Sequence, residues 1–184
     1  YVIRPHLDYR GFAGQIASGT VSPGDELVVM PAGARARVAG IDTFEGSYAK
    51  ASAPRSVTLR LDREVDISRG DILVRPGEEP WVAHRFDAWV VWMSETPLRA
   101  GQPYILKHTS RYLRFAFDHV IAAVNLDDLS EFPADSLALN DIGRVRLTTH
   151  RPLCADAYAA NRNTGAFVVI DPVTNNTVAA GMLL

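Results

Sequence analysis

The alternation of apolar and polar residues most constrains this chain, because its period is that of a β-strand almost everywhere. Apolar residues take every second position in Ser56–Leu61, and residues 143–149 alternate in the same way. Turn-forming sequences such as Pro31–Gly33 and Arg69–Asp71 separate these runs at intervals of about ten residues. A single helical turn is expected at 127–132, and no amphipathic helix of normal length is expected elsewhere. Short strands without helices to cover a parallel sheet predict an all-β fold, a barrel or a sandwich.

The strands fall into two groups on either side of a polar stretch bounded by two prolines, Pro76–Pro80. A length of 184 residues fits one domain or two small ones. The sequence predicts two domains, residues 1–80 and residues 81–184. The first is expected to hold strands at 12–21, 26–30, 35–38, 56–61 and 72–74, and the second at 87–93, 103–108, 114–125, 143–149, 166–170 and 177–183.

Composition narrows the setting in which the protein works. Apolar residues make up 47% and charged residues 22%, which is typical of a soluble globular protein. A formal net charge of -2 provides no overall field that would attract nucleic acid. No apolar run approaches the ~18 residues of a membrane span, no signal peptide opens the chain, and a lone cysteine cannot form an internal disulfide. We expect a cytoplasmic protein and no membrane partner.

The beginning of the chain suggests that it is part of a longer polypeptide. It opens with Tyr1 rather than methionine, in a segment that reads as a strand. We therefore expect that some of the parent protein's chemistry lies outside these residues.

Glycine-containing motifs in the first half carry a family likeness. They resemble the second domain of translation-factor GTPases, the barrel found in elongation factor Tu and its relatives. The resemblance implies an antiparallel β-barrel of the translation-factor domain II type for residues 1–80. The motifs are Arg10-Gly-Phe-Ala-Gly14, Ser18-Gly19, Pro23-Gly-Asp25 and Arg69-Gly-Asp71-Ile-Leu73.

Motifs in the second half resemble the large subunit of bacterial sulfate adenylyltransferase, in the two barrels that follow its GTPase domain. Phe86–Met93, Ser136–Val145 and Asn161–Asp171 carry this likeness, which extends over nearly the whole chain. It implies a second antiparallel barrel, of the domain III type, for residues 81–184. The chain departs from the family at Ser52–Arg55, where a glycine-containing turn is usual, and at Cys154–Asp156, where a more apolar stretch is usual.

The resemblance also implies a function for the parent protein. That enzyme makes adenylylsulfate and pyrophosphate from ATP and sulfate, driven by GTP hydrolysis, and the adenylyl transfer takes place on a separate small catalytic subunit. GTP and magnesium would bind in a GTPase domain that precedes Tyr1, and some members are fused to adenylylsulfate kinase. The barrels would link the GTPase domain of the same polypeptide to the small subunit. The alternative is a translation-factor fragment that binds aminoacyl-tRNA, which the second-half motifs disfavour.

No catalytic, GTP-binding or metal site is expected in this chain itself. The sequence contains neither a phosphate-binding loop that ends in Gly-Lys-Ser/Thr nor the base-reading Asn-Lys-x-Asp motif. Cys154 has no neighbouring base and is interpreted as a small buried hydrophobe. The histidines show no metal-ligand spacing; they are His6, His84, His108, His119 and His150.

Basic residues gather in one short stretch, 107–114. Lys107, Arg111 and Arg114 are the candidate partner contacts, with His108 and Tyr112 among them. Such a group could meet phosphate, RNA or an acidic protein surface. The simpler interpretation is a solvated loop beside the strand expected at 114–125.

Two tryptophans point to a second candidate contact. Trp89 and Trp92 are an odd number of positions apart, so a strand at 87–93 places them on opposite faces. We expect one of them to lie at the surface or under another element.

Overall fold

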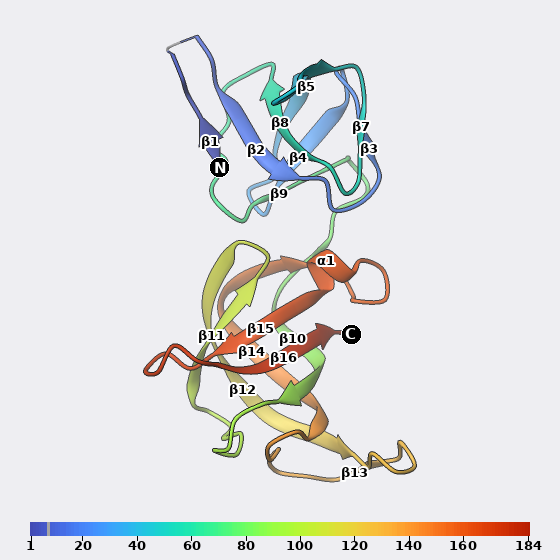
Figure 1. Ribbon diagram of the computed structural model, residues 1–184, viewed down its shortest axis with the longest axis vertical. Helices are drawn as coiled ribbons and strands as arrows, with labels where there is room; N and C mark the ends of the chain where they lie inside the picture. Colours follow the sequence, from blue (N-terminus) through green and yellow to red (C-terminus); the bar gives the residue numbers. More distant parts are fainter. Residues whose placement is uncertain (7) are drawn as a thin grey trace. The chain divides into compact units, whose positions relative to one another are not determined.

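Antiparallel β-strands make up nearly all the regular structure in the computed structural model, which describes residues 1–6 and 8–184. Every strand pairing in that part of the chain is antiparallel. The strands belong to two compact units, Tyr1–Pro80 and Trp81–Leu184 (Figure 1). The predicted all-β fold class is confirmed. No helix among the described residues has the length and apolarity needed to cross a membrane.

The first unit is a sheet in the order β1-β2-β8-β5-β4-β9, with β6 paired to β5 and a separate pair β3-β7. Hydrogen-bonded pairing between described residues does not close this path. The strands are β1 (Val2–Ile3), β2 (Gly11–Gln15), β3 (Thr20–Val21), β4 (Glu26–Met30), β5 (Ala34–Thr43), β6 (Gly46–Tyr48), β7 (Ala51–Ser52), β8 (Ser56–Leu61) and β9 (Ile72–Val74).

Alternation along these strands builds the core of the first unit. Val57 and Leu59 on β8 are buried, as their spacing predicts, and they pack in a cluster with Ile41 of β5. The stretch 12–21 was expected to be one strand, but it forms β2 and β3. Gly19, directly before β3, takes φ of +68°, a left-handed conformation that glycine adopts readily.

The second unit is a closed barrel, because β12 at the end of the path β11-β15-β16-β10-β14-β12 pairs back to β11. The short β13 pairs with β12 outside this ring. The elements are β10 (Trp81–Trp92), β11 (Pro103–His108), β12 (Arg111–Val124), β13 (Glu131–Phe132), β14 (Ile142–Ala155), α1 (Arg162–Gly165), β15 (Ala166–Ile170) and β16 (Thr177–Leu183).

The helical turn expected at 127–132 is displaced and does not continue. The Asn125 carbonyl accepts one hydrogen bond from the Leu129 N–H, and residues 131–132 form β13. The Asn125 and Asp128 side chains accept hydrogen bonds from backbone N–H groups two residues ahead, which holds the loop. The helix lies instead at α1, where the Asn161 side chain accepts a hydrogen bond from the N–H of Asn163. Such a cap is the usual start of a helix.

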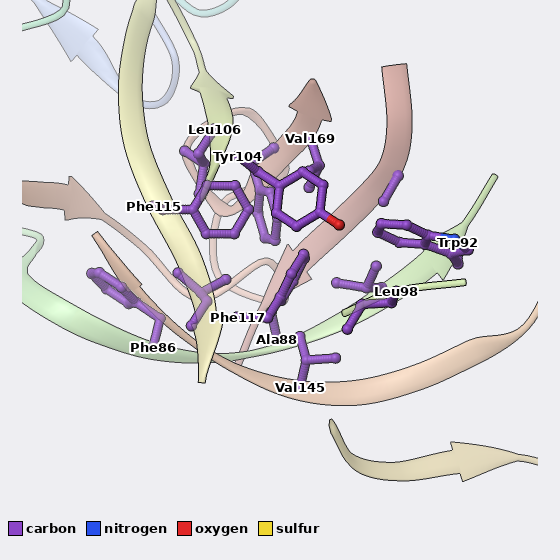
Figure 2. Packing of buried hydrophobic residues seen from close by; sticks show 14 of the residues in the cluster. Phe86, Ala88, Trp92, Leu98, Tyr104, Leu106, Phe115, Phe117, Val145 and Val169 are labelled. Carbon is purple, nitrogen blue, oxygen red and sulfur yellow. The ribbon is translucent and has the colours of Figure 1, made fainter. Parts of the chain in front are cut away.

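Aromatic side chains fill the barrel (Figure 2). The ring of Phe117 lies 5.7 Å from that of Tyr104, 5.0 Å from that of Phe115 and 6.2 Å from that of Trp92, centroid to centroid. All three pairs meet edge to face, an arrangement that aromatic rings prefer. The Trp92 indole N–H donates to the Thr96 carbonyl at 2.9 Å, so this buried ring leaves no unmet donor.

Candidate interaction surface

The basic residues singled out from the sequence lie on the hairpin of β11 and β12. Lys107 pairs with Tyr112 across the strands, and His108 pairs with Arg111. Side chains alternate between the two faces of a strand, so Lys107, Tyr112 and Arg114 take outward positions while His108 and Arg111 take inward ones. The three candidate cations therefore do not form one patch. Their role as partner contacts stays a prediction.

His108 and Arg111 belong to a polar cluster at one end of the barrel. His108 is 1% exposed, and its Nε2 lies 2.7 Å from the Thr164 carbonyl oxygen of α1, to which it donates. The Thr164 hydroxyl donates to Asp156. Arg111 has one buried guanidinium nitrogen, Nη1, with no hydrogen-bond partner among the described residues.

Burial sets the charge of His108. Loss of solvent lowers the pKa of its imidazole, the Thr164 carbonyl opposes that effect, the neighbouring Arg111 lowers the pKa further and Asp156 raises it. The net direction is down, so the ring is neutral at pH 7. His108 therefore ties α1 to the hairpin, a role that the sequence analysis missed. Its signal was the alternation of Tyr104, Leu106 and His108 on one face.

The outside of the barrel carries an apolar surface over β11, β15, β16 and β10. These four strands are neighbours in the sheet (Figure 1). Val168 is paired across strands with Ala180, and Ala180 is paired with Val91. Ile105 is paired in the same way with Ile170. The side chains of this surface are partly exposed, and Met182 reaches 36%. We call this surface the outer apolar wall; it consists of Trp89, Val91, Ile105, Val168, Ile170, Ala180 and Met182.

The two tryptophans of β10 lie on opposite faces of the strand. Trp92 is buried at 1% exposure, whereas Trp89 lies on the outer face beside Met182. The expectation that they occupy opposite faces is confirmed. The wall as a whole was missed, although the run Ala166–Ile170 is apolar on both faces. A strand of that kind is expected to be covered on both sides.

Charges at the two edges of the wall are paired differently. On the β14 side, the Arg146 guanidinium donates to both carboxylate oxygens of Asp87, at 2.7 and 2.8 Å. Arg144 is also paired there, with its Nη2 3.1 Å from Oε2 of Glu131. These hydrogen bonds from Arg146 lower the pKa of Asp87. Toward β12, Lys107 and Arg114 take part in no ion pair within the described part of the chain. The positive charges of Lys107 and Arg114 therefore lie along the β11–β12 side of the wall.

Other features offer less chemistry. An open hollow of about 580 Å³ at the end of the barrel is lined by polar groups that include Glu95, Gln102 and Asp171. The described residues hold no group of three or more His, Cys, Asp or Glu side chains placed to bind a metal ion. Cys154 is buried at 2% exposure, as a small hydrophobe would be.

Comparison with known proteins identifies relatives of both units. Residues 85–184 match the family model described as GTP-eEF1A C-terminal domain-like. The whole chain is 46% identical over 185 residues to sulfate adenylyltransferase subunit 1 of Chromobacterium violaceum and covers 39% of that protein. It is 43% identical over 190 residues to the bifunctional enzyme CysN/CysC of Mycobacterium tuberculosis and covers 31% of it. The chain thus spans well under half the length of these relatives.

Solved structures agree with the fold. A structure of sup35 complexed with GDP superposes with a TM-score of 0.86 at 19% identity, covering 95% of this chain and 43% of that one. A structure of sup35 complexed with GMPPNP gives 0.85 at 18% identity. At this identity the likeness is one of fold alone.

Proposed function

The chain belongs to the GTP-eEF1A C-terminal domain-like family, and from that premise we propose that it forms the non-catalytic barrel portion of a sulfate adenylyltransferase subunit 1. The observation that carries the proposal is the match to subunit 1 of this enzyme over the full length of the chain, at 46% identity. The resemblance first seen in the sequence motifs is confirmed by these relatives.

In this proposal the parent enzyme joins sulfate to the adenylyl group of ATP, with release of pyrophosphate, and GTP hydrolysis drives the reaction. The GTPase domain of the same polypeptide holds GTP and magnesium, and a small catalytic subunit carries out the transfer, all in the cytoplasm. The barrels transmit the nucleotide state of the GTPase domain to the small subunit. The absence of a phosphate-binding loop from the sequence supports a non-catalytic role for this portion.

The parent protein is proposed in two domain arrangements, with and without a fused kinase domain. Subunit 1 proteins and bifunctional enzymes both match the chain over its whole length, at 46% and 43% identity. A parent with an appended adenylylsulfate kinase and a parent without one are therefore both consistent with the barrels.

The translation-factor alternative makes a different prediction about nucleic acid. A barrel pair that binds aminoacyl-tRNA should show an affinity that falls steeply with salt, because contacts with phosphate dominate such binding. We expect no saturable tRNA binding at physiological salt, since relatives at 40–46% identity are sulfate adenylyltransferase subunits.

Reconstitution tests the proposal. The full-length subunit that contains this chain is mixed with the small subunit, and adenylylsulfate formation is measured with and without GTP. We expect GTP to stimulate the reaction, and no stimulation in the presence of both subunits would contradict the proposal. In parallel, calorimetry on the 184-residue chain alone should show no binding of GTP. Saturable micromolar binding that GDP displaces would contradict the non-catalytic assignment.

A further inference from the structure

We propose that the outer apolar wall, with Lys107 and Arg114 at its edge, is the docking surface for the small catalytic subunit. The matching face of that subunit would present apolar side chains at its centre and carboxylates opposite the two cations. This inference rests on the proposed function, which supplies the partner.

The apolar surface extends across four neighbouring strands. Single exposed apolar residues are ordinary on soluble proteins, but a contiguous patch across neighbouring strands marks an interaction site. Outward positions on the neighbouring strands are mixed: β14 presents Arg144, Arg146 and Thr148 beside Ile142, and β12 presents Asp118 and His119 beside Ala116 and Ile121. The wall strands β15 and β16 place no charged residue on this face.

The cations around the wall differ in whether they have carboxylate partners. Arg144 and Arg146 already have carboxylate partners within the chain, so their charge is largely neutralised. Lys107 and Arg114 have none among the described residues, and they lie on the same outer face, on strands that pair with each other. Two cations on one side of an apolar centre favour a partner with carboxylates on the corresponding side, which would fix the orientation of docking.

Tyr112 strengthens this edge of the surface. Tyr112 is 59% exposed, and the centroid of its ring lies 6.0 Å from the Lys107 ammonium nitrogen. Tyrosine and arginine are enriched among the residues that contribute most to binding at protein interfaces. The Lys107–Tyr112 pair therefore offers an amphipathic contact where the apolar centre meets the charged border.

The wall lies over the packed core of the barrel. The side chains between the wall residues on β15 point inward, and Phe167 and Val169 are 3% and 0% exposed. The wall is thus the outer face of strands that the packed core holds in place within a closed barrel. A rigid surface loses little conformational entropy on binding, which favours affinity.

The test is the affinity of the full-length subunit for the small subunit. Val168→Glu places a charge in the centre of the wall, and Met182→Glu does so on the next strand, at a more exposed position. Each should weaken binding by about 30-fold or more, because a carboxylate would be buried against apolar groups. The matched control Ile121→Glu changes a partly exposed apolar residue of β12 outside the wall and should bind like the wild type.

The charged edge has its own variant and control. K107E/R114E should weaken binding by about tenfold at low ionic strength and by little at ~1 M salt, because salt screens exposed charges. R99E/R151E makes the same change in net charge at two exposed arginines outside the wall and should have little effect. Circular dichroism and thermal melting identify any variant that fails to fold. If one of Val168→Glu and Met182→Glu fails to fold, the binding of the other tests the docking surface.

The outcomes separate the two proposals. Wild-type binding that Val168→Glu and Met182→Glu leave unchanged, with both variants folded, overturns the docking surface and leaves the proposed function standing. No association of the wild-type subunits overturns both. If the wall variants abolish self-association of subunit 1 but not binding of the small subunit, the wall binds a second copy and the inference is wrong.

Discussion

His108 holds α1 against the β11–β12 hairpin through the carbonyl oxygen of Thr164, 2.7 Å from its Nε2. From the sequence it belonged to a basic cluster, and its alternation with Tyr104 and Leu106 was the signal that its ring faces the core. The strand was expected to begin at Arg114, but β12 begins at Arg111, and this earlier start gives Arg111 the inward position. Strand boundaries depend on tertiary pairing, so periodicity alone could not place them.

Replacement of His108 should alter the pH dependence of stability. Burial lowers the pKa of His108, so on acidification the unfolded chain takes up the proton first, and the wild type loses stability as pH falls below about 6.5. His108→Gln removes that titration but keeps an amide N–H that can reach the carbonyl. The variant should be less stable than the wild type by about 1 kcal/mol at pH 8.

The difference between the two proteins should narrow as pH falls from about 6.5 toward 5. Urea unfolding followed by fluorescence at several pH values measures it. A difference that stays constant from pH 8 to pH 5 would show that His108 does not titrate in the folded barrel as its burial implies.

Gly181 is required by its cross-strand neighbour. A Cβ at this position would lie 2.3 Å from the ring of Phe167, which is 3% exposed and cannot move aside without disturbing the core. Gly181→Ala should therefore cost about 1–3 kcal/mol of unfolding free energy. Gly14→Ala is the control, because a Cβ there has no atom within 4 Å. Urea denaturation measures both, and equal effects would refute the packing argument.

At the scale of elements, alternation located most strands but not their limits. Val57 and Leu59 are buried as predicted, and the register of β5 against β8 shifts between Val38 and Gly40. The helical turn α1 was not anticipated, because a helix as short as Arg162–Gly165 has no apolar periodicity to read. The outer apolar wall needed the barrel's strand order, which brings β15 between β11 and β16 and which alternation does not encode.

Phe117 tests the aromatic core of the second unit. It is fully buried on β12 and contacts the rings of Tyr104, Phe115 and Trp92, so Phe117→Ala should cost about 3–5 kcal/mol. Tryptophan fluorescence reports this unit alone, because all 3 tryptophans of the chain lie in it: Trp81, Trp89 and Trp92. The variant should lower the urea midpoint of the fluorescence transition.

Val29→Ala provides the matched control. Val29 is 0% exposed in the core of the first unit, which is built from residues of that unit. We expect this variant to leave the tryptophan transition in place. A shift as large as that of Phe117→Ala would show that the two units unfold as one cooperative body.

At the scale of the whole molecule, the fold by itself does not identify the function. The sup35 structures share the fold at 19% and 18% identity, and a fold is compatible with many activities. Sequence motifs such as Asn161–Asp171 separated the sulfate enzyme from translation factors, and the relatives at 40–46% identity agree. The partner surface could not be identified from the motifs, because it is formed by residues from strands distant in the sequence.

The most direct test of the central claim is an exchange of barrels. The region of Chromobacterium violaceum sulfate adenylyltransferase subunit 1 that matches this chain over 185 residues is replaced by the chain itself. The chimera is combined with the small subunit of the same organism, and adenylylsulfate synthesis is measured with and without GTP. We expect the chimera to keep GTP-stimulated synthesis, whereas the same exchange with the barrel pair of elongation factor Tu should lose it. A folded chimera without GTP stimulation would contradict the claim that this chain is the barrel portion of such an enzyme.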